Sequence, residues 1–212
     1  MYAIQKFPRT PHLEGSRLQP GDQDLTQVKF AEIAGRHIVV EEKIDGANCG
    51  ISFDFDGNLR LQSRGHYLTG GPREKQFALL KQWASEHQHA LHDRLGSRYL
   101  MYGEWMFAKH TIFYNRLPSY FLEFDIFDTD TKTFLSTTRR RELLDALPVN
   151  TVPILHDGPA AKIEALLAHI GPSRFIDPNA KDDLEKLAVA AGQSAQAVSA
   201  ETDLSGKMEG LY

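Results

Sequence analysis

The sequence has little cysteine, no long apolar run and no large excess of either charge. Cys49 is the single cysteine among 212 residues, which excludes an internal disulfide and indicates a reducing compartment. No stretch approaches the roughly 18 consecutive apolar residues of a membrane-spanning helix. The N-terminal segment MYAIQKFPRTPHLEG lacks the apolar centre of a secretion signal. We therefore expect a cytoplasmic protein that has no membrane partner.

The net charge of −4 gives the molecule as a whole no attraction for the phosphates of nucleic acid, so any nucleic-acid site must be a local basic surface. With 42% hydrophobic residues, the chain is long enough for one globular domain with a core, or for a domain with a small appendage. Residues 1–36 are rich in proline, glycine and charge. We interpret 1–36 as an irregular lead-in and 37–212 as the domain.

Alternating apolar residues predict several strands early in the chain. The segment 37–64 is expected to form a β-meander, with a strand into Lys43, a strand over 48–54 and a strand over 59–63. Asp56-Gly57 is a typical hairpin turn between the last two. Further strands are predicted over 98–107 and 120–135.

Helical patterns come later in the chain and are bounded by proline and glycine. A helix of about six turns is predicted over 72–95, because Pro72 suits a first helical position and Gly96 a stop. Shorter helices are predicted over 138–147, 160–170 and 181–191. Strands joined by hairpins, followed by helices, indicate an α+β fold with antiparallel sheets.

One lysine stands in an unusual setting. Lys43 ends the run VVEEK and is followed by Ile44-Asp45-Gly46, which supplies a carboxylate and then a residue that permits a tight turn or the close approach of a ligand. A lysine chosen at random is usually a solvated surface side chain. A lysine at the end of a strand, beside a turn and several acids, is instead a candidate nucleophile.

Four further polar clusters fall near the ends of predicted strands. They are SRG at 63–65, GEW at 103–105, EFDIFD at 123–128 and KMEGLY at 207–212. Each is weak alone, because glycine beside a charge is a common turn pattern. In the strand over 121–127, alternation predicts Phe124 and Ile126 on one face, with Glu123, Asp125 and Phe127 on the other.

Taken in chain order, these clusters resemble motifs I, Ia, III, IIIa and IV of the covalent nucleotidyltransferases, which include ATP-dependent DNA and RNA ligases and mRNA capping enzymes. The matching segments are KIDG at 43–46, SRG at 63–65, GE at 103–104, FDI at 124–126 and EGLY at 209–212. EEKIDGANCGI and PRTPHLEGSR resemble the RNA ligase branch in particular. The resemblance implies an adenylation domain of two antiparallel sheets with flanking helices, which cradles ATP.

The resemblance also implies a reaction. Lys43 attacks the α-phosphate of ATP, pyrophosphate leaves, and the AMP on the lysine passes to the 5′-phosphate of an RNA, where a 3′-OH displaces it and seals the strand in RNA repair. Lysine attacks only as the free amine, and its ordinary pKa of about 10.4 leaves little free amine at neutral pH. Nearby cations must favour the neutral form, so Mg²⁺ or Mn²⁺ is expected besides ATP.

The resemblance assigns a role to each motif residue. Lys43 is the nucleophile, Asp45 is the motif I acid, and Glu209 helps to place the metal. Arg64 holds ribose or phosphate, with an exposed strand-end arginine as the alternative reading.

Four more residues are expected to contact the nucleotide. By the same resemblance, Glu42 accepts a hydrogen bond from the adenine amino group, and Glu104 contacts the ribose side of AMP. Asn48 holds ribose or phosphate. Phe124 stacks on the purine, although its apolar strand makes plain core packing an equal alternative.

Some residues outside the motifs have plainer interpretations. The triple arginine 139–141 at a predicted helix start is expected on a solvated face, with contact to RNA phosphate as the less favoured alternative. Cys49 is expected to be a small core residue. His12 and Arg17 in the lead-in are expected either to contact phosphate or to have a structural role.

The sequence departs from the family pattern at its end. Motif V, a strand with two lysines that bind the α-phosphate, should follow motif IV closely, whereas this sequence ends at Tyr212, and it shows no C-terminal domain of the kind many ligases carry. We expect such a chain to bind ATP and metal but to adenylylate Lys43 slowly. The alternatives are a ligase for nicked DNA and a non-catalytic nucleotide- or RNA-binding domain. A capping guanylyltransferase is less favoured, because KIDGAN extends the resemblance to RNA ligases.

Overall fold

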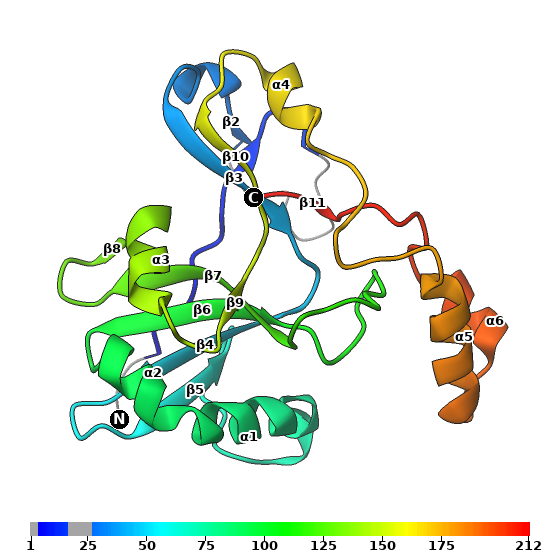
Figure 1. The fold of residues 1–212 in the computed structure, drawn as a ribbon, viewed down its shortest axis with the longest axis horizontal. Coiled ribbons are helices and arrows are strands. Elements are labelled where there is room, and N and C mark those ends of the chain that lie inside the picture. Colours follow the sequence, from blue (N-terminus) through cyan, green and yellow to red (C-terminus); the bar gives the residue numbers. More distant parts are fainter. Residues whose placement is uncertain (1–3, 17–26) are drawn as a thin grey trace.

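The structure, a computed structural model, describes residues 4–16 and 27–212 (Figure 1). It has one sheet of six strands, one of three strands and a short parallel pair, with helices around them. This confirms the expected α+β class with two mainly antiparallel sheets. In the described ranges, the helices are too short or too polar to cross a membrane.

The larger sheet holds most of the predicted strands. Its members are β4 (Ala47–Phe53), β5 (Leu59–Ser63), β6 (Tyr99–Trp105), β7 (Phe121–Asp128), β8 (Thr133–Phe134) and β9 (Asn150–Thr151). The order is β5-β4-β6-β7-β8, and β9 pairs with β7 in parallel. The β4–β5 hairpin is antiparallel, as Asp56-Gly57 predicts, and β7–β8 form a second antiparallel hairpin.

The smaller sheet contains β3 (His37–Lys43), β10 (Ile154–Pro159) and β11 (Gly210–Leu211), in the order β10-β3-β11. The predicted meander is therefore wrong at its first strand, because β3 pairs with β10 and β11, which come much later in the chain, and not with β4. The connection Ile44-Asp45-Gly46 carries the chain from one sheet to the other. Backbone groups on both sides of β3 need partners, and local sequence patterns do not reveal distant ones.

The helices lie close to the predicted positions, with interruptions. The long helix expected over 72–95 is divided where His87 leaves helical geometry, at φ −102° and ψ 9°. The segments are η2 (Pro72–Phe77), α1 (Ala78–Glu86), α2 (Gln88–Leu95), α3 (Thr137–Leu144), α4 (Ile163–Leu167), α5 (Ala180–Ala190) and α6 (Ala195–Ala200). The patterns did not predict α6, β9 or β10.

The lead-in is mainly irregular within its described part. It contains β1 (His12–Leu13), β2 (Gln27–Val28) and the single turn η1 (Phe30–Glu32). Phe30 packs with Val40 of β3, Ala160 and Leu166 of α4 in a small core beside the smaller sheet. This part of the lead-in therefore covers β3, the strand that carries Lys43.

The larger sheet has a core on each face. One core joins Ile51 and Met101 to Leu80 and Leu91 of α1 and α2, and it includes Cys49, which is fully buried as expected. The opposite core gathers residues of β6 and β7 with those that follow β3 and β6. Its members include Ile44, Tyr102, Tyr114, Leu122 and Phe124.

A β-bulge changes the predicted alternation in β7. Tyr102 pairs with Asp125 but Gly103 pairs with Glu123, so β7 has one extra residue at Phe124. Phe124 consequently lies in the core with Leu122, whereas Ile126 lies in the opposite core. The prediction that Phe124 and Ile126 share a face is wrong, because the bulge interrupts the period of two.

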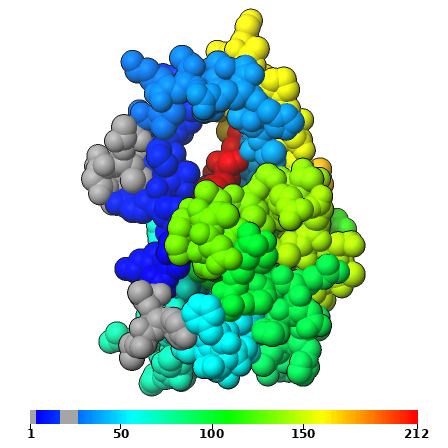
Figure 2. Space-filling model, turned by 90° about the vertical axis from the view of Figure 1, so that its left-hand side faces the viewer, coloured from blue at the N-terminus to red at the C-terminus, as the bar shows by residue number. Residues whose placement is uncertain are grey.

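The two sheets meet around the C-terminal segment. In Figure 1 the smaller sheet and α4 lie above the larger sheet, α1 and α2 lie below it, and α5 and α6 extend to one side. The space-filling view shows an opening bordered by the blue segment leading into β3 and the green segment containing α3, with the red C-terminal residues visible inside (Figure 2). The predicted motifs I and IV lie at this junction.

Candidate active site

Lys43 and Glu209 lie side by side because β11 pairs with the end of β3. Gly210 is opposite Lys43 and Leu211 is opposite Glu42 in an antiparallel register. The ammonium Nζ of Lys43 forms an ion pair with Oε1 of Glu209. The Lys43 side chain is 44% exposed, so solvent and a ligand can reach it. Motifs I and IV, far apart in sequence, therefore form one site.

A loop over 106–120, between β6 and β7, holds Asp45. The Oδ2 atom of Asp45 accepts hydrogen bonds from the backbone nitrogens of Thr111 at 2.7 Å and Ile112 at 3.2 Å. Its Oδ1 atom lies 3.5 Å from Nδ1 of His110. The backbone nitrogen of Asp45 donates to the Tyr114 hydroxyl at 3.0 Å. These loop residues carry no sequence motif and were not predicted to belong to the site.

Gly46 is needed because Trp105 and Met106 lie too close to its backbone to leave room for a side chain. A Cβ atom at this position would lie 2.6 Å from Sδ of Met106 and 3.1 Å from the backbone oxygen of Trp105. Gly46 does not have a positive φ. The close approach of β6, and not a left-handed turn, therefore explains the glycine of motif I.

Glu104 lies near Lys43, Glu209 and Asp45. It is part of β6, where it pairs with Asn48 of β4. Burial raises the pKa of Glu104 to about 8, against the opposing effect of Lys43. The nearby carboxylates of Glu209 and Asp45 raise this pKa further. The Oε2 atom of Glu104 is buried without a hydrogen-bond partner among the described residues. The group is thus poised to ionise when a cation or a set of donors approaches.

Glu42 is 1% exposed, and both of its carboxylate oxygens are buried without a hydrogen-bond partner in residues 4–16 and 27–212. Burial raises the pKa of Glu42, and the nearby Ser173 hydroxyl and Arg174 backbone lower it without reaching hydrogen-bond geometry. Leaving such a buried acceptor unpaired is costly. A ligand with a hydrogen-bond donor would remove that cost.

The remaining predicted residues surround this centre at different depths. Arg64 is exposed just after β5, and its charge lowers the pKa of Glu104. Asn48 is half-buried in β4. Phe124 is 8% exposed, and the edge of its ring meets Phe7 with a centroid distance of 4.9 Å and an angle of 85°. Phe124 therefore belongs to the core, with Phe7 covering part of its ring.

The arginine run behaves differently from the prediction. Arg139 and Arg141 are exposed, but Arg140 is buried and binds two buried acids. Its Nε and Nη2 donate to Glu123 at 2.9 and 3.0 Å, and its Nη1 donates to Glu41 at 3.1 Å. Placing Arg140 on a solvated face was wrong, because it joins α3 to a strand of each sheet.

The structure does not test whether His12 and Arg17 of the lead-in contact phosphate. His12 is part of β1. Arg17 falls outside the described residues. Both alternatives for these residues, contact with phosphate and a structural role, stay predictions.

A family model for RNA ligases matches residues 36–212. The chain belongs to the RNA ligase family. A search of curated proteins gave no match. The family assignment thus rests on a match that covers the whole of both sheets from β3 onward.

Solved structures of another member of the RNA ligase family have the same fold. A mutant of the RNA ligase from Naegleria gruberi with ATP and manganese has a TM-score of 0.57 at 20% identity, over 98% of this chain and 52% of its own. A second mutant with ATP and manganese gives 0.54 at 22% identity, over 85% and 46%. The same enzyme with pyrophosphate gives 0.52 at 22% identity, over 85% and 46%. This chain spans about half the length of these structures.

The carboxylates of this RNA ligase family member suit a hard cation, but they do not enclose one. Within the described part of the chain, no three carboxylate, imidazole or thiolate groups come close enough to hold a metal by themselves. Glu209 and the buried, unpaired oxygen of Glu104 are of the type that Mg²⁺ and Mn²⁺ prefer. Mg²⁺ keeps several waters and shares phosphate oxygens in such sites, so the residues fit a metal bound together with a nucleotide.

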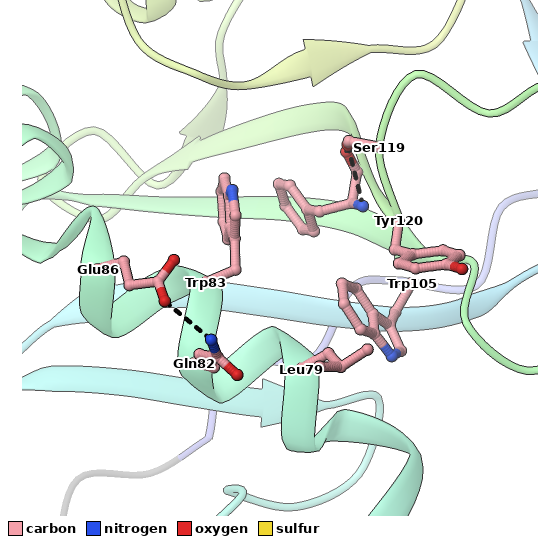
Figure 3. Close-up of a pocket in the computed structure, with 8 residues that line it drawn as sticks. Leu79, Gln82, Trp83, Glu86, Trp105, Ser119 and Tyr120 are labelled. Atoms are coloured by element: carbon pink, nitrogen blue, oxygen red, sulfur yellow. Dashed lines mark hydrogen bonds between the residues drawn. The ribbon is translucent and has the colours of Figure 1, made fainter.

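The groove shown in Figure 3 belongs to another face of the molecule. It has a volume of about 230 Å³ and is lined by Trp83 of α1, Trp105 and Tyr120, among others. Trp105 packs in the core against α1 and α2, while its neighbour Glu104 points to the other side of β6. The groove therefore shares none of its lining residues with the site around Lys43.

Proposed function

We propose that this chain is the adenylyltransferase part of an ATP-dependent RNA ligase, with residues 37–212 as the catalytic domain, 1–36 as its lead-in and Lys43 as the nucleophile. The observation that carries the proposal is the contact of Lys43 with Glu209 at the junction of the two sheets, surrounded by Asp45 and Glu104. Membership of the RNA ligase family supports RNA as the substrate. The related structures with ATP, AMP, manganese and pyrophosphate support ATP and a divalent metal.

Lys43 would supply the electron pair for the first step. The Lys43 nitrogen forms a bond to the α-phosphorus of ATP, the bond to the bridging oxygen breaks, and pyrophosphate leaves. AMP then passes to the 5′-phosphate of an RNA, and a 3′-OH displaces it to join the strands. RNA with these two ends is therefore the proposed partner, and the cytoplasmic location and a role in RNA repair stay predictions.

The acids around Lys43 must act with a cation. The Lys43 ammonium is paired with Glu209, whereas only a free amine can attack phosphorus. Glu209 and Glu104 would hold a divalent metal, which supplies positive charge that favours the free amine and offsets charge on the phosphates. When Glu209 turns to a cation, Lys43 loses its ion-pair partner. Asp45 stays bound to the loop over 106–120.

The nucleotide base would be selected at Glu42. Its buried oxygens lack donors, and the amino group of adenine can donate a hydrogen bond to them. Guanine has a carbonyl oxygen at the corresponding place and would bring two acceptors together, so GTP is disfavoured. The Phe124 ring is packed in the core beside Phe7, so Phe7 would have to move for Phe124 to stack on the base. Arg64 and Asn48 would bind ribose or phosphate.

The proposal is tested by labelling and strand joining with the same preparation. The native chain, with α-labelled ATP and Mn²⁺, should acquire a covalent label that GTP does not give. The label should then move to a 5′-phosphorylated RNA strand, and a nicked RNA duplex should be sealed. Equal sealing of a nicked DNA duplex would favour a DNA ligase, and ATP binding without any label would favour a non-catalytic domain.

A further inference from the structure

Asp45 is fastened by one loop at both its backbone and its side chain. Thr111 and Ile112 donate their backbone hydrogens to the carboxylate, and the Tyr114 hydroxyl accepts from the Asp45 backbone nitrogen at 3.0 Å. These partners lie within the segment 106–120. The loop thus determines both where the Asp45 backbone runs and where its carboxylate points.

The backbone hydrogen bond is important because of where Asp45 lies. The residues 44–46 connect β3 to β4 across two different sheets, so they belong to no strand. A backbone N–H in such a connection needs a partner other than a neighbouring strand. The Tyr114 hydroxyl supplies that partner for Asp45, which lies two residues after the nucleophile Lys43.

The Tyr114 hydroxyl is built into the protein rather than resting on its surface. Tyr114 is buried in the core that also contains Ile44, Met106 and Ile112. Burial raises the pKa of Tyr114 above its ordinary value, and the nearby carboxylates of Asp45 and Glu209 act in the same direction. The hydroxyl therefore stays neutral. A neutral phenol oxygen can accept the hydrogen bond from the Asp45 backbone N–H.

The loop is itself tied to the segment that leads to Glu209. The Asn115 side chain donates to Asp177 at 2.9 Å and to Asp183 at 2.8 Å. The Arg116 backbone nitrogen donates to the Phe175 backbone oxygen at 3.0 Å, and the Asp203 backbone nitrogen donates to the Thr111 backbone oxygen at 2.8 Å. One loop therefore connects the acid of motif I with the chain that carries the acid of motif IV.

We propose that Tyr114 is a positioning residue for adenylylation, which fixes the turn after Lys43 through the Asp45 backbone. This inference rests on the proposed function of Lys43. A nucleophile must meet the α-phosphorus in a near-attack geometry, and small displacements of such groups slow a reaction strongly. Tyr114 acts by holding Asp45 and Lys43 in place and does not touch the reacting atoms.

Tyr114→Phe removes the hydroxyl and keeps the ring in its core. Tyr102→Phe is the matched control, because Tyr102 is a buried tyrosine of the same core whose hydroxyl donates to the Gln5 backbone oxygen at 2.7 Å. Each variant loses one partly buried hydrogen bond, of 3.0 Å at Tyr114 and 2.7 Å at Tyr102. They differ in whether that bond reaches the turn after Lys43.

Two measurements on the full chain decide the inference. Hydrogen exchange at the Asp45 amide should be roughly tenfold faster in Tyr114→Phe and unchanged in Tyr102→Phe, as expected for the loss of one hydrogen bond. Single-turnover labelling by ATP and Mn²⁺ should be slower by about 10- to 100-fold in Tyr114→Phe, at an ATP concentration for half-saturation within about twofold of the native value.

The outcomes separate this inference from the proposed function. Equal exchange at Asp45 in both variants would show that Tyr114 does not hold the turn. Equal labelling rates in both variants would show that adenylylation does not need the hydrogen bond from Asp45 to Tyr114. Either of these two results overturns the inference. A native chain that takes no label would remove the proposed function, and with it the positioning role, while the exchange experiment still reports the contact itself.

Discussion

Replacing Arg140 by methionine should destabilise the protein far more than replacing its neighbour Arg139. Arg140 is buried and shared between Glu123 and Glu41, whereas the Arg139 side chain is 67% exposed and pairs with Glu142, which is 56% exposed. Methionine keeps most of the apolar length of the side chain and removes its charge. Both variants make the same substitution in α3, so a difference between their stabilities reports the loss of the buried ion pairs and not a change in helix propensity.

The magnitude follows from what is left behind. Removing one partner of a buried ion pair costs about 3–5 kcal/mol, because the remaining charge is buried without compensation. In Arg140→Met two carboxylates lose the same guanidinium, so the free energy of unfolding should fall by at least that amount. An exposed ion pair contributes about 0–1 kcal/mol, which sets the expected loss for Arg139→Met.

The loss in Arg140→Met should also depend on pH. Burial raises the pKa of Glu41 and of Glu123 above 4.5, and Arg140 lowers both. Without the guanidinium both pKa values rise further, so the folded variant retains protons that its unfolded chain has already released. Its stability therefore falls more steeply with rising pH than that of the native chain, between about pH 5 and pH 8.

Urea unfolding at pH 5 and at pH 8 measures these differences. We expect a large loss for Arg140→Met at pH 8, a smaller loss at pH 5, and a small, nearly constant loss for Arg139→Met. Adding Glu123→Gln to Arg140→Met should recover part of the stability at pH 8, because one uncompensated charge is removed. The reasoning is refuted if Arg140→Met and Arg139→Met lose equal stability, or if the loss does not change with pH.

Two further predictions concern the ligand site. Since the pKa of Glu104 lies at about 8, binding of Mn²⁺ and ATP at pH 7 should release close to one proton. Calorimetry in buffers of different ionisation enthalpy measures that release, which Glu104→Gln should abolish. Equal proton release in both proteins would show that Glu104 does not bind the metal. Phe124→Ala should weaken ATP binding by about 1–3 kcal/mol if the ring stacks on adenine. Phe124→Leu keeps bulk, so equal losses of stability in both variants with unchanged ATP affinity would make Phe124 packing alone.

The ordered motifs assigned Lys43 and Glu209 to one site, but they did not predict how the chain brings these two residues together. Lys43 and Glu209 come from motifs far apart in sequence and form an ion pair, while the roles assigned to them stay predictions. The pairing of β3 with β11 that creates this contact was not predicted. A strand of two residues has no periodicity to detect, and its partner is chosen by tertiary packing.

The missed features share a physical cause. Arg140 has the same local sequence as its exposed neighbours, and only the position of α3 against β7 decides that it is buried. The loop over 106–120 binds Asp45 largely through backbone groups, which every residue type carries. The bulge at Phe124 moved one side chain to the other face of β7. Such details depend on the assembled fold and leave no pattern in a single sequence.

The central claim is that Lys43 carries AMP during the reaction. The most direct test is to incubate the native chain with ATP and Mn²⁺, digest it, and locate the bound AMP by mass spectrometry, with Lys43→Ala and Lys43→Arg treated in parallel. The account predicts an acid-labile phosphoramidate on the peptide that contains Lys43 and none in either variant, since arginine stays protonated and supplies no free amine. AMP attached to a different residue of the native chain, or to the Lys43→Ala chain, would contradict it.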